Sequence, residues 1–309
     1  MHDYLYPNSQ RPPDFLCIGA QKAGTSWVYS VLYHIAGVFV PPIKESNYLL
    51  EASDRDRAWA RQYRLYQVEQ MEKKYRTRLL PLRDIASRLD QIDHFKAPEV
   101  DDDWYRCVFG FARDDQIAGE VCPSYLTLAT EQSIRHALQL NPDLRVLMMV
   151  RDPVERFWSQ IRMAVRYKRV TQPIGSLLHD ESALRNFLCF SDYARSIERW
   201  SKLLPPGRMR MMLYDNIEQR PKWAAHEILS FLGAESGSVY CTEQRVNAGL
   251  PRPMTPGQRR RVLDLMRPQY EYLSGKFPEA VDRWLMVHDR ALRSDDDARC
   301  DTRESPRVA

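Results

Sequence analysis

Short apolar runs alternate with helical segments along the chain, and this order predicts the fold. Three runs, at residues 14–20, 144–152 and 208–215, have the length and continuous hydrophobicity of buried parallel strands. Segments with apolar residues at helical spacing follow each run, and another precedes the third, from about residue 192 to residue 204. Because alternating strands and helices form a parallel sheet covered on both faces, we predict an α/β fold of three layers, a central parallel sheet flanked by helices. Ligands in such folds bind beyond the carboxyl ends of the strands.

Two segments depart from this alternation. Residues 51–98 are dense in charged side chains, with aromatic and leucine residues at helical intervals, which predicts one or two amphipathic helices inserted between core elements. Residues 294–309 contain almost no apolar side chains, so we expect a disordered tail there. With 309 residues, of which 44% are hydrophobic, the chain can bury one large core, and we expect a single domain over residues 1–293.

The overall charge excludes some partners. The formal net charge is only +4, from 45 basic and 41 acidic residues, so the composition does not indicate binding to nucleic acid or to an anionic membrane.

The N-terminal segment lacks the apolar stretch of a signal peptide, and no run approaches the ~18 apolar residues of a membrane span. The six cysteines are scattered, without a C-x-x-C pair or a cluster of histidines. We therefore expect a soluble, cytoplasmic protein with free thiols and no zinc site, and its oligomeric state stays open.

The first predicted strand runs into a glycine-rich loop with the sequence CIGAQKAGTSW. Gly19 and Gly24 have the spacing of a nucleoside-triphosphate P-loop, G-x-x-x-x-G-K-[ST]. Thr25, however, stands where that lysine should be, and Lys22 lies inside the loop. Because the glycines permit a tight turn, the amides of residues 22–27 can converge on one oxyanion, next to the positive end of the following helix. The loop predicts either an anion site in a P-loop-like fold, with Lys22 as a point charge, or a purely structural turn.

The predicted strand at residues 144–152 ends in a second candidate motif, RDPVERFWSQ. Arg151 lies at the strand terminus, and Ser159 follows about two helical turns later, on nearly the same face of the next helix. Together they can hold a second anion, which would indicate a ligand with two separated anionic groups. Alternatively, Arg151 pairs with Asp152 or Glu155, and Ser159 is a surface hydroxyl.

Together the two motifs resemble those of sulfotransferases that use 3′-phosphoadenosine 5′-phosphosulfate (PAPS). GAQKAGTSW is similar to the family's 5′-phosphosulfate loop, and RDPVERFWSQ is similar to its 3′-phosphate motif. The order of PPIKESNYL, the pair Trp104 and Tyr105, and GEVCPSYL resembles glycan sulfotransferases of the heparan-sulfate type and their bacterial relatives. The resemblance covers residues 13–285 and is weak from LYDNIEQRP onward. It implies transfer of a sulfuryl group to an acceptor hydroxyl, with adenosine 3′,5′-bisphosphate (PAP) as the second product.

The resemblance also implies roles for individual residues. Lys22 would contact the bridging oxygen or the sulfonate and offset the charge that develops on the leaving 5′-phosphate. ATP chemistry places Mg²⁺ at the β- and γ-phosphates, whereas PAPS has one phosphate next to its sulfuryl group and requires no metal. The implied cofactor-binding residues are Lys22, Ala23, Gly24, Thr25, Ser26, Trp27, Arg151 and Ser159, with Arg245 and Arg252 from a loop that closes over the nucleotide in relatives. The alternative for Trp27 is a place in the core.

An acceptor hydroxyl must lose its proton as it attacks sulfur, so a general base near the sulfonate is expected. By resemblance to the heparan-sulfate group, this base is Glu45 in PPIKESNYL, and Lys44 would hold the sulfonate or position Glu45. Alternatively, Lys44 and Glu45 form a solvated turn. The chain departs from several relatives at Val121, where they carry a lysine, so that lysine's role is absent or has moved to Lys44. Glu120 is then either a second carboxylate in the site or a buried structural anchor.

The acceptor and two rival functions stay open. Loops and insertions set specificity in this fold, and here residues 51–98 and 167–190 combine mixed charge with aromatic side chains. These segments allow a glycan or a small-molecule acceptor such as a phenol, a lipid or a natural-product alcohol. A catalytically inactive protein that binds PAPS or PAP would share the nucleotide motifs. An ATP-dependent small-molecule kinase would share the fold, although Thr25 in place of the P-loop lysine argues against it.

Overall fold

The structure is a computed structural model that describes residues 10–53, 56–76, 82–234 and 252–301. The chain divides into two compact units, each described by itself below. Unit 1 comprises Met1–Val150 and Ile197–Asn247, and unit 2 comprises Arg151–Ser196 and Ala248–Ala309. The single domain expected over residues 1–293 includes most of both units and stays a prediction.

Unit 1 is built on a sheet of five parallel strands in the order β2-β3-β1-β4-β5. The strands are β1 (Phe15–Gly19), β2 (Val38–Phe39), β3 (Ile117–Val121), β4 (Arg145–Val150) and β5 (Met209–Leu213). The three apolar runs of the sequence are β1, β4 and β5, and the predicted α/β fold with a central parallel sheet is confirmed. β1 and β4 are neighbours in the sheet, and their near-complete burial explains their continuous hydrophobicity.

Two strands, β2 and β3, were not predicted from the sequence. β2 has only two residues, and β3 contains Gly119 and Glu120, which are residue types depleted in strands. Packing requires the glycine, because a Cβ atom at Gly119 would lie 2.3 Å from the carbonyl oxygen of Phe15 in β1. The close approach of two backbones therefore removes the apolar pattern by which β3 could have been found.

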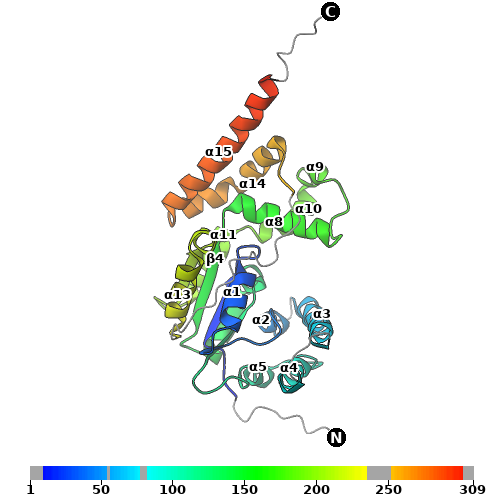
Figure 1. Ribbon diagram of the computed structural model, residues 1–309, viewed down its shortest axis with the longest axis vertical. Coiled ribbons are helices and arrows are strands. Elements are labelled where there is room, and N and C mark those ends of the chain that lie inside the picture. Colours follow the sequence, from blue (N-terminus) through cyan, green and yellow to red (C-terminus); the bar gives the residue numbers. More distant parts are fainter. Residues whose placement is uncertain (1–9, 54–55, 77–81, 235–251, 302–309) are drawn as a thin grey trace, which may run out of the picture. The chain divides into compact units, whose positions relative to one another are not determined.

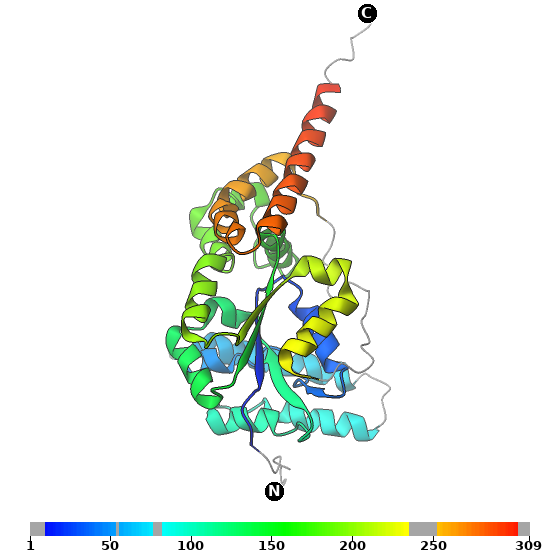
Figure 2. The same cartoon turned by 90° about the vertical axis from the view of Figure 1, so that its left-hand side faces the viewer.

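Helices cover both faces of this sheet. Figure 2 shows α1 (Thr25–Tyr33) and α13 (Pro221–Leu232) on one side and α7 (Glu131–Leu140) on the other. The remaining helices within this unit are α2 (Tyr48–Glu51), α3 (Arg57–Arg76), α4 (Leu82–His94), α5 (Asp102–Phe109), α6 (Ser124–Leu128) and α12 (Tyr214–Gln219).

A buried ion pair joins the parts of the helical segment 51–98 to one another. This segment contains α3 and α4, and α3 packs beside α2 (Figure 1). Arg64 of α3 makes two hydrogen bonds of 2.8 Å to the carboxylate of Glu51, and both side chains are buried. The same guanidinium donates to the carbonyls of Phe95 and Ala97. Because a buried charge requires such partners, these contacts fix α3 to the end of α2 and to the residues that follow α4.

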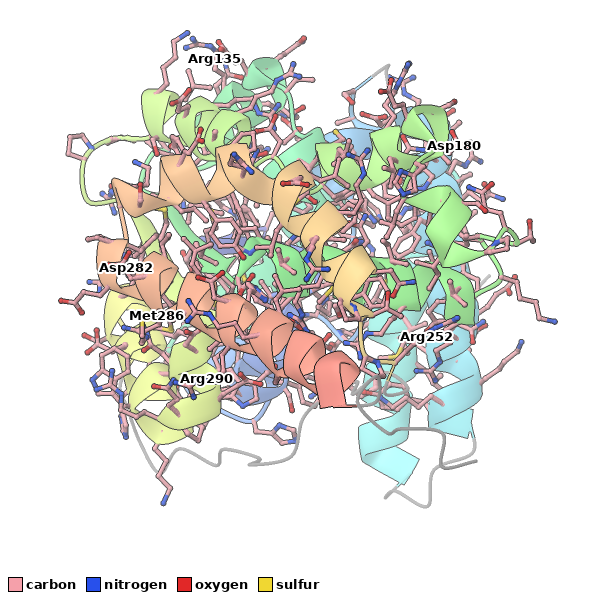
Figure 3. The ribbon with its side chains drawn as sticks, turned by 90° about the horizontal axis from the view of Figure 1, so that it is seen from above. Arg135, Asp180, Arg252, Asp282, Met286 and Arg290 are labelled. Carbon is pink, nitrogen blue, oxygen red and sulfur yellow. The ribbon has the colours of Figure 1, made fainter. Side chains whose placement is uncertain are left out.

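Unit 2 is helical. It contains α8 (Pro153–Arg166), α9 (Ile174–Leu177), α10 (Glu181–Cys189), α14 (Pro256–Ser274) and α15 (Pro278–Asp301), while α11 (Tyr193–Leu203) begins in unit 2 and ends in unit 1. Figure 3 shows Asp282, Met286 and Arg290 along α15. This helix continues into the tail expected from residue 294, because an existing helix adds one backbone hydrogen bond per residue without new nucleation. Residues 302–309 of that tail lie outside the described residues.

Candidate active site

The loop that carries Lys22 turns sharply from β1 into α1. Lys22 has a left-handed φ of 70°, and Gly24 ends the loop with φ of 93°. The amide of Ala20 donates to the carbonyl of Met149 in β4 at 2.9 Å, which fixes the loop at the carboxyl edge of the sheet. α1 begins at Thr25, and no side chain of the described residues caps its first turn. The positive end of this helix therefore adjoins the loop, as an anion site requires.

Ala23 and Trp27, two of the residues whose amides were predicted to converge on an anion, use those amides to form the turn itself. The amide of Ala23 donates to the carbonyl of Ala20 at 3.1 Å, and the amide of Trp27 donates to the carbonyl of Gly24 at 2.9 Å. Ala23 and the Trp27 ring are also buried, so Trp27 has the core position that was its alternative. An anion in this loop would be held by Lys22, Gly24, Thr25 and Ser26.

Gly24 has no room for a side chain, since a Cβ atom would lie 2.9 Å from Ile217 and from Tyr214. We expect Gly24→Ala to lower the free energy of unfolding by about 1–3 kcal/mol, measured by urea denaturation. Gly207→Ala measures the cost of a left-handed backbone without a steric clash, because Gly207 has φ of 79° but an added Cβ atom would have no neighbour within 4 Å. Gly37→Ala, with neither constraint, should stay within about 0.5 kcal/mol of the wild type. Equal stability of the Gly24 and Gly37 variants would contradict the close packing.

Lys44 and Glu45 form an ion pair in the segment between β2 and α2. Lys44 Nζ lies 2.5 Å from Glu45 Oε1, and each side chain is 16% exposed. The other carboxylate oxygen, Oε2, accepts a hydrogen bond of 2.9 Å from the hydroxyl of Tyr63 in α3. Glu45 and Asn47 have left-handed φ values of 69° and 58°, a backbone conformation that is uncommon for residues such as glutamate. The pair is thus an ordered, largely covered feature, in contrast to the solvated turn that was its alternative.

This pair lies near the carboxyl ends of β1 and β3. Burial raises the pKa of the Cys17 thiol in β1 to about 12, and the nearby Lys44 charge opposes that rise. The Cys122 thiol, which follows β3, donates a hydrogen bond of 3.2 Å to Asn47 Oδ1, two residues after Glu45. Burial raises the pKa of Cys122, the Glu45 charge adds to this rise, and the Lys44 charge opposes it. Because parallel strands end at the same edge of a sheet, the pair lies at the edge from which the Lys22 loop emerges.

A buried carboxylate holds the backbone beside Glu45. Glu120 is 1% exposed and accepts hydrogen bonds from the hydroxyls of Tyr105 at 2.7 Å and Tyr125 at 2.8 Å. It also accepts one of 3.2 Å from the amide of Ser46. Burial raises the pKa of Glu120, and these hydrogen bonds oppose the rise. Glu120 therefore fits the structural-anchor alternative, because it ties β3 to the residue that follows Glu45.

Arg151 and Ser159, the two residues predicted from the second motif, both lie in unit 2. The Tyr193 hydroxyl donates to the carbonyl of Arg151 and accepts from its amide, both at 3.1 Å. This contact fixes the backbone of Arg151, whose side chain is half-buried. Ser159 lies in α8 and is 9% exposed, so it is not the surface hydroxyl of the alternative interpretation.

Asp152, next to Arg151, forms a buried hydrogen-bond network that the sequence did not predict. Its carboxylate caps α8 by accepting from the amides of Val154 and Glu155. It also accepts from the Tyr270 hydroxyl at 2.6 Å and from His288 Nε2 at 2.9 Å. Burial alone would raise the pKa of Asp152, but the hydrogen bonds from His288 and Tyr270 outweigh it and hold the pKa below its ordinary value. The signal available in the sequence was an aspartate before proline at a helix start.

Two C-terminal helices complete this network. Arg259 of α14 lies 2.6 Å from His288 Nδ1. Because a guanidinium only donates hydrogen bonds, Nδ1 accepts and the ring proton lies on Nε2, where His288 donates it to Asp152. Tyr270 also comes from α14, and His288 comes from α15. These helices therefore hold the N-terminus of α8, directly after Arg151.

We expect Asp152→Asn to lower the free energy of unfolding by about 2–4 kcal/mol at pH 7, because a charged acceptor of buried hydrogen bonds is lost. Since the pKa of Asp152 is depressed in the folded state, its stabilisation is complete above the unfolded pKa of about 3.9 and is lost as pH falls through the folded value. The difference from the wild type should therefore persist from pH 7 to about pH 5 and shrink as the pH falls from there to about pH 3 in urea denaturation. Asp264→Asn, at a 60% exposed carboxylate, is the control with little effect at either pH. A difference that does not change with pH would contradict the prediction.

The remaining predicted residues are the two weakly implied arginines. Arg252 is exposed shortly before α14 (Figure 3), and its carbonyl accepts a hydrogen bond of 2.7 Å from the indole of Trp158. Arg245 lies outside the described residues.

In the described ranges, no three His, Cys, Asp or Glu side chains gather as metal ligands. None of the helices in the described part of the chain is long and apolar enough to cross a membrane.

Comparison with known proteins agrees with this architecture. The sulfotransferase family matches residues 13–236, which is more than half of the chain. A solved sulfotransferase from Alicyclobacillus acidocaldarius has the same fold, with 20% identity and a TM-score of 0.64 over 88% of this chain and 98% of that one. The sulfotransferase domain from the curacin biosynthetic pathway is 15% identical, with a TM-score of 0.48 over 74% of this chain and 77% of that one. No curated protein sequence matches the chain. The family match shows that this chain belongs to the sulfotransferase family.

Proposed function

We propose that the chain transfers the sulfuryl group of PAPS to the hydroxyl group of an acceptor. Membership of the sulfotransferase family supports the reaction class. The observation that carries the proposal is the ordered Lys44–Glu45 pair at the carboxyl edge of the sheet, the same edge as the Lys22 loop. A positively charged loop for an anionic donor and a carboxylate for the acceptor proton are the two parts that this reaction requires.

In this proposal, two groups of residues bind the nucleotide. Lys22, Gly24, Thr25 and Ser26 bind the 5′-phosphosulfate through loop amides, the positive end of α1 and the Lys22 ammonium group, while Ala23 and Trp27 support the turn. Arg151 and Ser159 bind the 3′-phosphate. The guanidinium group of Arg151 can donate two parallel hydrogen bonds to the phosphate oxygens. Arg245 and Arg252 belong to the segment that covers the nucleotide. Residues 1–293 form one catalytic domain, and the helical segment 51–98 shapes the acceptor site.

The reaction is a single in-line displacement at sulfur. The acceptor oxygen bonds to sulfur as the bond from sulfur to the bridging 5′-phosphate oxygen breaks, and the electron pair of that bond leaves on PAP. The acceptor proton moves to Glu45, because each of its oxygens has a lone pair beyond the one used by Lys44 or Tyr63. Lys22 stabilises the negative charge that develops on the leaving phosphate, and Lys44 positions Glu45 or the sulfonate. The products are a sulfate ester and PAP, and no metal is required.

The test is transfer of labelled sulfate from PAPS by the full chain. The protein is incubated with PAPS and a panel of glycans, phenols and aliphatic alcohols, and we expect a sulfate ester together with an equal amount of PAP. Calorimetric titration with PAP in the absence of Mg²⁺ measures the nucleotide site separately. PAP binding without transfer to any acceptor would indicate a catalytically inactive binding protein. Mg²⁺-dependent binding of ATP would indicate a kinase.

A further inference from the structure

A row of aromatic rings on α3 leads to the carboxylate of Glu45. Trp59, Tyr63 and Tyr66 are spaced by four and three residues, so they lie on one face of the helix. The rings of Trp59 and Tyr63 stack with their centroids 5.5 Å apart, and those of Tyr63 and Tyr66 are 6.4 Å apart. The Tyr63 hydroxyl donates to Glu45 Oε2 at 2.9 Å. The row is therefore in direct contact with the proposed base.

The two outer rings of this row are exposed. Trp59 is 42% exposed and Tyr66 is 49% exposed. By contrast, Tyr75 of the same helix is 3% exposed, and its hydroxyl lies 2.9 Å from that of Tyr33. α3 thus keeps one tyrosine in the core and presents two large rings outward beside Glu45.

Amide and ammonium groups extend the same face of α3. At 3.6 residues per turn, the exposed polar side chains on the aromatic side of the helix are Gln62, Gln70, Lys73 and Lys74. The acidic residue Glu69 lies at the margin of this face, about 20° around the helix axis from Gln62, and Glu72 falls on another side of the helix. We define the aromatic face as Trp59, Tyr63 and Tyr66 together with these four polar residues. It combines ring surfaces with hydrogen-bond donors.

An open face of this composition favours one kind of ligand. A small phenol is held best in an enclosed pocket that covers most of its surface, which exposed rings on a helix do not provide. An extended ligand can contact several rings in turn, and Trp59 and Tyr66 are separated by about 10 Å along the helix. The negative π face of an aromatic ring attracts the weakly positive C–H groups on the flat side of a sugar. The surrounding amides and ammonium groups can bind the hydroxyl groups at the sugar's edge.

We propose that the aromatic face is the acceptor subsite and that the acceptor is a saccharide. This inference rests on the proposed sulfuryl transfer, because the face gains its role through contact with Glu45. A sugar stacked on Trp59 and Tyr66 brings its hydroxyl groups to the side of α3 that Glu45 contacts. Tyr63 fixes the carboxylate relative to the bound sugar through its hydrogen bond.

The test measures sulfate transfer to cellopentaose, maltopentaose, chitopentaose, a heparin-derived hexasaccharide and 4-nitrophenol. We expect at least one oligosaccharide to accept sulfate from PAPS. Trp59→Ala and Tyr66→Ala should each raise the KM for that oligosaccharide about tenfold, with kcat within about threefold of the wild type. Trp223→Ala is the matched control, because Trp223 is a 41% exposed tryptophan on α13, and it should change neither constant.

Two results would overturn the saccharide subsite. One is an oligosaccharide KM that neither α3 substitution changes, and the other is sulfation of 4-nitrophenol without sulfation of any oligosaccharide. Calorimetric titration of the same oligosaccharides into protein saturated with PAP separates this inference from the proposed reaction. Binding that is lost in Trp59→Ala, without any sulfate transfer, would support the subsite and overturn the reaction. Absence of both binding and transfer would overturn the subsite.

Discussion

Replacement of Lys22 by glutamine is expected to lower kcat by roughly a hundred- to a thousandfold, the effect of removing one group that stabilises charge in a transition state. Lys22 lies in the loop between β1 and α1, where its ammonium group adds to the positive end of the helix. The negative charge on the 5′-phosphate grows as the bond to sulfur breaks, so the loss falls mainly on kcat. Initial rates at saturating PAPS measure kcat, and calorimetry with PAP measures binding, which should weaken much less.

The left-handed backbone of Lys22 makes the choice of controls important. Glutamine and arginine adopt φ of 70° at similar cost, so Lys22→Gln and Lys22→Arg differ mainly in charge. Lys22→Arg should recover part of the lost rate, while both variants unfold at the same urea concentration. Lys202→Gln, at a lysine 69% exposed on α11, should leave kcat unchanged. A Lys22→Gln enzyme with kcat within about threefold of the wild type would assign the charge stabilisation to another group.

The centre of the sheet was predictable because both faces of its strands are buried. β1 and β4 appear in the sequence as continuous apolar runs for this reason. β3 did not, because its packing against Phe15 requires Gly119 and its carboxyl end carries Glu120. Gly119 and Glu120 thus interrupt the apolar pattern of β3. The same two residues let β3 approach β1 and anchor the loop beside Glu45.

The site was predictable only where its residues are close in the sequence. Glu45 and Lys44 were found together in one motif, but Tyr63 reaches Glu45 from α3, whose position depends on the buried pair Arg64 and Glu51. Helical spacing shows that α3 is a helix and does not show which way it packs. The bond from His288 to Asp152 spans 136 positions, so no local pattern predicts it. Motifs identify the groups that bind or react, whereas distant packing determines how they are held.

Replacement of Glu45 by glutamine is expected to lower kcat by about a hundred- to ten-thousandfold, the usual contribution of a general base. Glutamine keeps the size of the side chain, and its amide oxygen can still accept a hydrogen bond from Lys44 or Tyr63. It cannot take up the acceptor proton. Steady-state rates at saturating PAPS and acceptor measure this loss of kcat.

Two further variants separate the base from its surroundings. Tyr63→Phe removes one hydrogen bond to Glu45 but leaves the carboxylate, so kcat should fall only about two- to tenfold. Glu69→Gln, at an exposed carboxylate of α3, should leave kcat unchanged. If Glu45→Gln retains the kcat of the wild type, the base is a different group, and the Lys44–Glu45 pair is a structural contact of the loop. If Tyr63→Phe loses as much as Glu45→Gln, the hydroxyl of Tyr63 takes part in the proton transfer itself, because the loss of one supporting hydrogen bond is too small to explain it.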